Sequence, residues 1–138
     1  MRRRVVALAI LAAPAVAAAG CGGEAADLFV VTRSGSIPGA ALRLRVTDDG
    51  RASCNGRGLV EISSGELIRA RDAARELADP TKHHVVLPPR PGSVLRYRVR
   101  TEDGAAAWSD TSRGQPPVFF AVAKVTRDVA RGPCRLAR

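Results

Sequence analysis

The sequence predicts an α+β fold in which two helices pack on one face of an antiparallel sheet of about four strands, built from two hairpins. Two observations lead to this class. Apolar and polar residues alternate with the period of a half-buried strand in residues 42–47 and 95–100, and each run leads into an Asp/Gly turn signal. Two longer segments, beginning near Ser63 and Pro116, repeat their apolar residues at helical spacing. Hairpins and amphipathic helices in this order favour a two-layer arrangement.

The first strand is expected at residues 27–33, which contain four consecutive apolar residues. Residues 34–39 follow with two glycines and a proline, which end a regular element. From residue 40 the clean alternation begins, and the segment 48–50, Asp-Asp-Gly, turns the chain back. A hairpin is therefore predicted here.

Two registers are open for this hairpin. A three-residue loop with Gly50 in the left-handed conformation sets Cys54 opposite Leu44 on the core face, whereas a two-residue loop sets it opposite Arg45 on the solvent face. We expect the first register, because a disulfide to a C-terminal helix requires Cys54 to face the layer that this helix occupies.

Both helices carry recognisable ends. Ser63 and Glu66 stand three residues apart as a capping box, and residues 79–80, Asp-Pro, are expected to end the first helix. The prolines at 116–117 open the second helix, and residues 132–133, Gly-Pro, end it. The predicted buried stripes are Leu67, Ala70, Ala74, Leu77 and Ala78 in the first helix, and Phe119, Val122, Ala123, Val129 and Ala130 in the second.

The second hairpin is expected to turn at residues 103–104, Asp-Gly, a strong two-residue turn signal. This register pairs Val99 with Trp108 across the strands. Trp108 is therefore predicted to lie in the core.

The N-terminal segment resembles a bacterial lipoprotein export signal. Residues 2–4 are arginines, residues 5–16 are apolar, and the small residues 18–20 precede Cys21 directly. This pattern predicts a signal peptide at 1–20, a diacylglycerol on Cys21, and anchoring to the outer face of the bacterial cell membrane. The alternative is an ordinary cleaved signal that happens to contain a cysteine.

The rest of the chain then divides into a short tether at 21–26 and a single domain at 27–138. In an oxidising compartment Cys54 and Cys134 form an even pair, and we expect a disulfide between them. The alternative is a metal site that combines these cysteines with the histidines at 83–84, but adjacent histidines on an extended segment point to opposite faces. We predict no metal and no cofactor.

The net charge is +9, of which the arginines at 2–4 contribute a part. The remaining arginines are spread along the chain instead of forming one basic run, and only five of the residues are Phe, Tyr or Trp. Nucleic-acid binding by stacking needs clustered cations with interleaved aromatics. We therefore expect no nucleic-acid partner.

Catalytic patterns are weak. A nucleophile and acid at Ser109 and Asp110 would need the Pro-rich segment that carries His83 and His84 to fold over the hairpin. The paired acids at 48–49 and 102–103 sit in expected turns. We predict that the domain is not an enzyme.

The organisation of residues 27–131 resembles the emfourin-like family of proteinaceous inhibitors. The likeness rests on the strand end at 31–35, Val-Thr-Arg-Ser-Gly, a helix before the Tyr97 strand, the turn at 103–104 and a closing helix at 116–117. The chain departs from the family pattern at Ser36, in its Pro-rich stretch at 88–92 and in its two domain cysteines.

The resemblance implies inhibition of an extracytoplasmic thermolysin-type metalloprotease. An inhibitor needs a rigid sheet that displays a stiff loop, and residues 33–39 and 82–92 are the two loops that qualify. The candidate partner-binding residues lie in the first: Arg33, Ser34, Gly35, Ser36 and Ile37.

A second hypothesis assigns binding to the polar face of the sheet. There the domain would hold another protein or an anionic surface polymer through five arginines: Arg43, Arg45, Arg96, Arg98 and Arg100. Arginines open to solvent would favour this hypothesis, and arginines paired with Asp and Glu would count against it.

Overall fold

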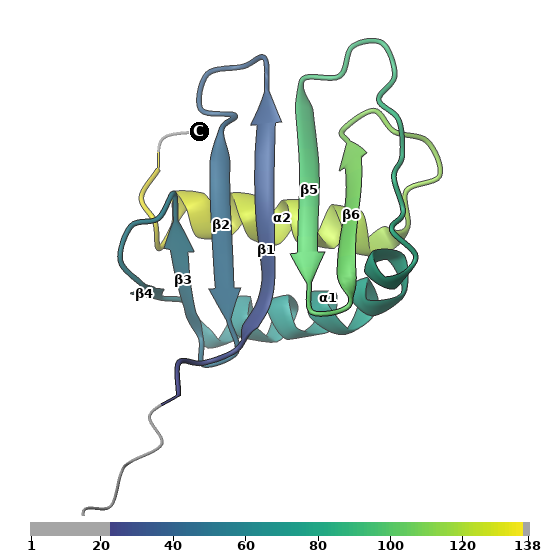
Figure 1. Ribbon diagram of the computed structural model, residues 1–138. Helices are drawn as coiled ribbons and strands as arrows, with labels where there is room; N and C mark the ends of the chain where they lie inside the picture. Colours follow the sequence, from purple (N-terminus) through teal and green to yellow (C-terminus); the bar gives the residue numbers. More distant parts are fainter. Residues whose placement is uncertain (1–22, 137–138) are drawn as a thin grey trace, which may run out of the picture.

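The computed structural model describes residues 23–136, which fold into one antiparallel sheet and two helices (Figure 1). The α+β class is confirmed. The sheet has six strands where about four were expected, and their order is β4-β3-β2-β1-β5-β6. The elements are β1 (Asp27–Gly35), β2 (Leu42–Thr47), β3 (Arg51–Cys54), β4 (Val60–Glu61), α1 (Ser64–Lys82), β5 (Leu95–Thr101), β6 (Gly104–Ser109) and α2 (Pro117–Arg131).

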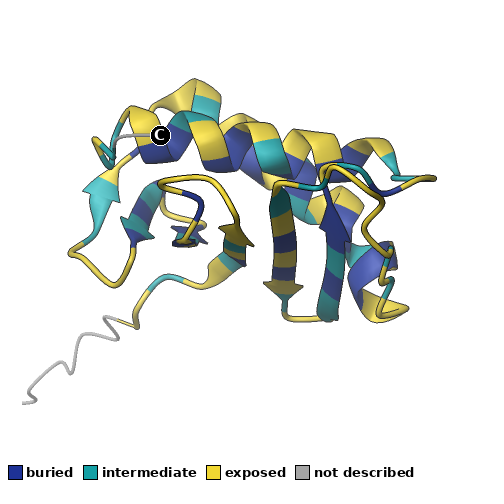
Figure 2. Ribbon diagram, turned by 90° about the horizontal axis from the view of Figure 1, so that it is seen from above, coloured by how far each residue is buried: buried dark blue, intermediate teal, exposed yellow. Residues whose placement is uncertain are grey.

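Both helices lie on the same side of the sheet. Figure 1 shows α1 and α2 behind the strands, and Figure 2, seen from above, shows the buried sides of the helices turned toward the sheet. The core fills the space between the two layers, with Phe29, Leu44, Val99, Phe119 and Val122 at 0% exposure. No described element covers the opposite face of the sheet.

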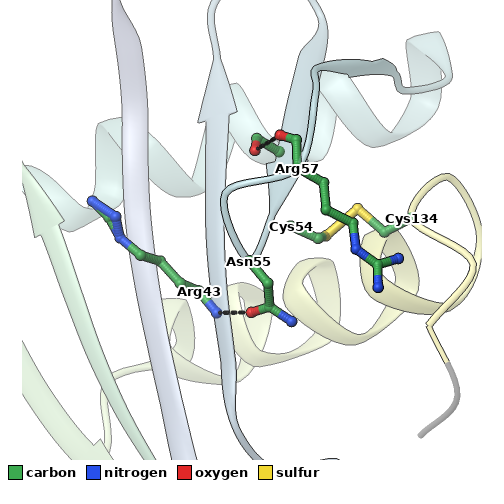
Figure 3. Close-up of a disulfide and its surroundings, with 6 residues drawn as sticks. Arg43, Cys54, Asn55, Arg57 and Cys134 are labelled. Atoms are coloured by element: carbon green, nitrogen blue, oxygen red, sulfur yellow. Dashed lines mark hydrogen bonds between the residues drawn. A yellow bond between two sulfur atoms is a disulfide. The ribbon is translucent and has the colours of Figure 1, made fainter.

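The first hairpin has the expected register. Leu44 pairs with Cys54, and Gly50 takes a φ of 85° in the three-residue loop. Cys54 is therefore buried on the helix side of the sheet, where it forms the predicted disulfide with Cys134 (Figure 3). This bond joins β3 to the segment that follows α2.

Two strand features were not predicted. β4 has only two residues, whose pairing with β3 places Val60 beside Ala52 and Glu61 beside Arg51, and so short a strand carries no alternation signal. The first strand also continues two residues past Arg33, because Ser34 and Gly35 pair with β5. Tertiary pairing thus extends a strand into a segment whose composition predicts a turn.

The predicted register of the second hairpin is wrong by two residues. Tyr97 pairs with Trp108, and Val99 pairs with Ala106. The two turn residues are those at 102–103, and Gly104 is the first residue of β6. A shift of two residues leaves each side chain on its face, so Trp108 is buried as expected, at 3% exposure.

Helix α1 begins as predicted and ends later than predicted. The Ser63 hydroxyl accepts from the Glu66 N–H and the Glu66 carboxylate accepts from the Ser63 N–H, which completes the capping box. Pro80 lies within the helix, which continues to Lys82. Because proline has no N–H, the carbonyl of Glu76 loses its usual donor within the helix.

Helix α2 has the predicted bounds, with the prolines at its start and Gly132 at its C-cap. Its Phe119 ring stacks on Trp108 with centroids 4.2 Å apart, and Trp108 stacks on Tyr97 at 5.2 Å. This stack connects α2 to β6 and β5 across the core.

Residues 23–136 contain the complete sheet, both helices, the core and the disulfide. This segment therefore holds the contacts that it needs to fold on its own. Within it, neither helix combines the length and the hydropathy that a membrane crossing requires.

Candidate functional site

The uncovered face of the sheet carries several arginines on the two strands that flank β1. Arg45 and Arg100 flank Val30 from its two neighbouring strands, and Arg43 and Arg98 flank Thr32 in the same way. Residues opposite each other in neighbouring strands share a face, so these four side chains lie on the side away from the helices. Arg96, opposite Ser34, adds a fifth.

Only one of the five arginines forms an ion pair among the described residues. Arg45 contacts the Asp27 carboxylate at 2.5 Å and the Glu24 carboxylate at 2.8 Å, and these hydrogen bonds raise the pKa of its guanidinium group, Asp27 contributing most. The other four are exposed and have no carboxylate within 4.0 Å in residues 23–136: Arg43, Arg96, Arg98 and Arg100. No carboxylate of the described residues neutralises these four charges, so an anionic partner can contact them directly.

The loop after β1 is closed by Arg33. Its Nε and one terminal nitrogen donate to the carbonyl oxygens of Ala40 and Gly39, each at 2.9 Å. The Ser36 N–H donates to the Val94 carbonyl at 3.2 Å, which ties the loop to the chain just before β5. The loop is thus held at both ends, while the Ile37 side chain is 44% exposed.

A groove of about 450 Å³ lies between this loop, β5 and α2. Arg33 and Ile37, two of the five predicted partner-binding residues, line it. Ser34, Gly35 and Ser36 are not part of its lining. The structure therefore brings two of the predicted residues to a concave surface and leaves the other three outside it.

Helix α2 supplies the wall that the sequence analysis missed. The lining residues from this helix are Phe120, Ala123, Lys124, Arg127, Ala130 and Arg131. Most of these residues are three or four positions apart in the sequence, so they form a second stripe along α2, beside the stripe that faces the core. This spacing was visible in the sequence, but only the loop beside the helix makes it one wall of a groove.

The segment after His84 does run beside β6, where the Ala107 N–H donates to the Val85 carbonyl at 2.9 Å, but the residues considered for catalysis form hydrogen bonds with other groups. The Ser109 hydroxyl contacts those of Thr111 and Ser112, and the Asp110 carboxylate accepts from the Ser93 hydroxyl and from the N–H groups of residues 94–95. His83 caps α1 and contacts Asp79, on a different element. These polar groups stabilise loops.

The alternative metal site with the two domain cysteines is wrong, because both sulfurs are joined in the disulfide. Within residues 23–136 there is no cluster of three or more His, Cys, Asp or Glu side chains placed to hold a metal ion. The predicted signal peptide at 1–20 and the lipidation site Cys21 lie outside the described residues.

The likeness to emfourin-like inhibitors stays a prediction. Comparison of the chain with protein-family models, with curated proteins and with solved structures gives no match.

Proposed function

We propose that this chain is a lipid-anchored, extracytoplasmic binding domain without catalytic activity, which holds an anionic polymer of the cell envelope against its arginine face. The observation that carries the proposal is the set of four exposed arginines without a carboxylate partner in residues 23–136.

Repulsion between these cations supports a polyanionic partner. Arg96, Arg98 and Arg100 alternate along β5, so their Cα atoms follow at intervals of about 7 Å on one face. Arg43 lies across β1 from Arg98. Like charges this close destabilise the free domain, and a partner with a regular row of negative charges removes that cost.

The test is retention of residues 22–138 on immobilised poly-L-glutamate, eluted with a salt gradient. Arg96→Glu with Arg98→Glu should elute at much lower salt than the parent. The variant replaces two positive charges of the arginine face by negative ones, so less salt is needed to screen the remaining attraction to the polymer. The control Arg75→Glu reverses one charge on α1, at a side chain that is 75% exposed and pairs with Asp72; it is compared with Arg96→Glu alone and should shift elution only slightly.

A second control keeps the charge. Arg96→Lys with Arg98→Lys should retain most of the binding, since a flexible polymer is held mainly by point charge. If Arg75→Glu weakens retention as much as Arg96→Glu alone does, retention reflects net charge alone and the arginine face has no special role.

Protease inhibition is the second candidate function. It is favoured by the way Arg33 closes its loop on Gly39 and Ala40 and leaves Ile37 exposed at the surface. A loop held in one conformation loses little entropy on binding and resists productive cleavage.

Inhibition is tested with thermolysin and a panel of related metalloproteases. The domain should slow the enzyme at nanomolar to micromolar concentration, and Ile37→Glu should weaken inhibition at least tenfold, whereas Ile68→Glu on α1, at a residue 59% exposed, should not. Full protease activity in the presence of the intact domain would exclude this function.

A further inference from the structure

Helix α2 presents two different stripes. One stripe enters the core through Val118, Val122, Val125 and Val129. The other stripe faces the groove. It begins with Phe120 and Ala123 and continues toward the C-terminus of the helix with three cations: Lys124, Arg127 and Arg131. The Phe120 side chain is 60% exposed, although a phenyl ring gains free energy when it leaves water.

The groove combines an apolar lining with cations at its edge. Leu95 and Tyr97 contribute from β5, Ile37 from the loop after β1, and Phe120 and Ala123 from α2. Its volume of about 450 Å³ lies within the usual range of small-molecule sites, roughly 300–1,000 Å³. An exposed apolar surface bordered by charges is typical of a ligand site.

The charge at this groove is positive. Four cations line it, and the nearby Asp128 carboxylate contacts Lys124 at 2.5 Å and Arg127 at 3.8 Å. Arg131 forms no ion pair among residues 23–136. Burial raises the pKa of Tyr97, and the positive charge of Arg33 opposes that rise.

From the apolar lining and the cations beside it, we infer that this groove binds the anion of a long-chain fatty acid. The alkyl chain lies along Leu95, Ala123 and Phe120, and the carboxylate is held by Arg127 and Arg131, which can donate two parallel hydrogen bonds to it. The inference does not depend on the proposed function, since the groove lies on the helix side of the sheet.

The experiment uses residues 22–138 with the disulfide formed and sodium tetradecanoate as the probe, below its micelle concentration. Binding is measured by calorimetry and by the emission of Trp108, the only tryptophan, whose ring stacks on Tyr97 in the groove wall. We expect one saturable site with a dissociation constant on the order of 10 μM. Tetradecanol and tetradecyltrimethylammonium, with the same chain length and a neutral or positive head, should bind at least about tenfold more weakly.

Three variants separate groove binding from adsorption elsewhere. Phe120→Asp and Arg127→Glu alter exposed positions and should each weaken tetradecanoate binding at least about tenfold, while Arg75→Glu on α1 should leave it unchanged. Circular dichroism of each variant checks that the fold is kept. Absence of saturable binding to the folded parent domain, equal binding of the alcohol, or equal losses in all three variants would each overturn the inference.

Discussion

The carbonyl oxygen of Thr81, in the last turn of α1, lies 2.4 Å from the position that a Cβ atom on Gly104 would occupy. Gly104 also has a φ of 148°, which side chains rarely allow. The end of the first helix therefore packs directly on the backbone of β6, and only glycine permits that approach.

Replacing this glycine should be costly. Gly104→Ala should lower the free energy of unfolding by about 3 kcal/mol, because steric overlap adds to backbone strain. The matched control is Gly92→Ala, since Gly92 has a φ of 84° but no atom within 4 Å of its added Cβ, and it should cost about 1 kcal/mol. Urea unfolding measures both variants, and equal losses would show that backbone strain alone requires glycine at 104.

Two buried threonines should respond to the same substitution with opposite signs. Thr126 is fully buried, and its hydroxyl has no hydrogen-bond partner within the described part of the chain, so Thr126→Val should stabilise the domain by about 1 kcal/mol. The Thr81 hydroxyl contacts the Leu77 carbonyl at 2.7 Å and the Thr101 hydroxyl at 2.8 Å. Thr81→Val should therefore destabilise by about 1–2 kcal/mol.

Thermal and urea unfolding of both valine variants give the comparison. The circular dichroism of the folded state should be the same in each, because valine and threonine have nearly the same shape. Destabilisation by Thr126→Val would mean that its hydroxyl is satisfied in solution.

The disulfide should supply a large part of the stability. Cys54 and Cys134 are 80 residues apart in the sequence, and a crosslink of that span stabilises by about 4 kcal/mol in the chain-entropy model. Reduction with dithiothreitol, or Cys54→Ser with Cys134→Ser, should lower the free energy of unfolding by that amount. Mass spectrometry confirms the redox state of each sample, and equal stability of the oxidised and reduced forms would contradict the expectation.

Tyr97 is the only tyrosine, so its titration can be followed directly by the ultraviolet absorbance of tyrosinate. Burial raises its pKa above the ordinary value of 10.0, while Arg33 opposes the shift. Because the folded-state pKa is the higher one, the contribution of Tyr97 to stability is fully present below pH 10 and is lost as the pH rises through the folded-state pKa.

The folded domain should therefore titrate at a higher pH than the same chain in urea. Tyr97→Phe should abolish the absorbance step, which assigns it. A midpoint in the folded domain equal to that in urea would show that solvent reaches the hydroxyl freely.

The candidate sites were predictable to different degrees. The alternation in residues 42–47 and 95–100 predicts that the arginines of each strand share its polar face. Because that face points away from the core, the alternation also predicts that these arginines are exposed. Which of them is paired was not predictable, because Arg45 meets Asp27 and Glu24 only when β1 lies beside β2. The groove depends on α2 and on a loop about 80 residues earlier in the chain, and no local pattern contains that relationship.

By itself, the sequence determined the α+β class, the ends of α2, the capping box at Ser63, the register of the first hairpin and the pairing of Cys54 with Cys134. The hydrophobic period, the helix caps and the turn residues indicate these features, because each involves residues close together in the sequence. The disulfide follows from the even number of cysteines in the domain. Tertiary structure decided the register of the second hairpin, where Gly104 is required for its approach to Thr81 and not for the turn. It also decided the extension of β1 and the continuation of α1 past Pro80, because packing and strand pairing between distant segments outweigh local preference.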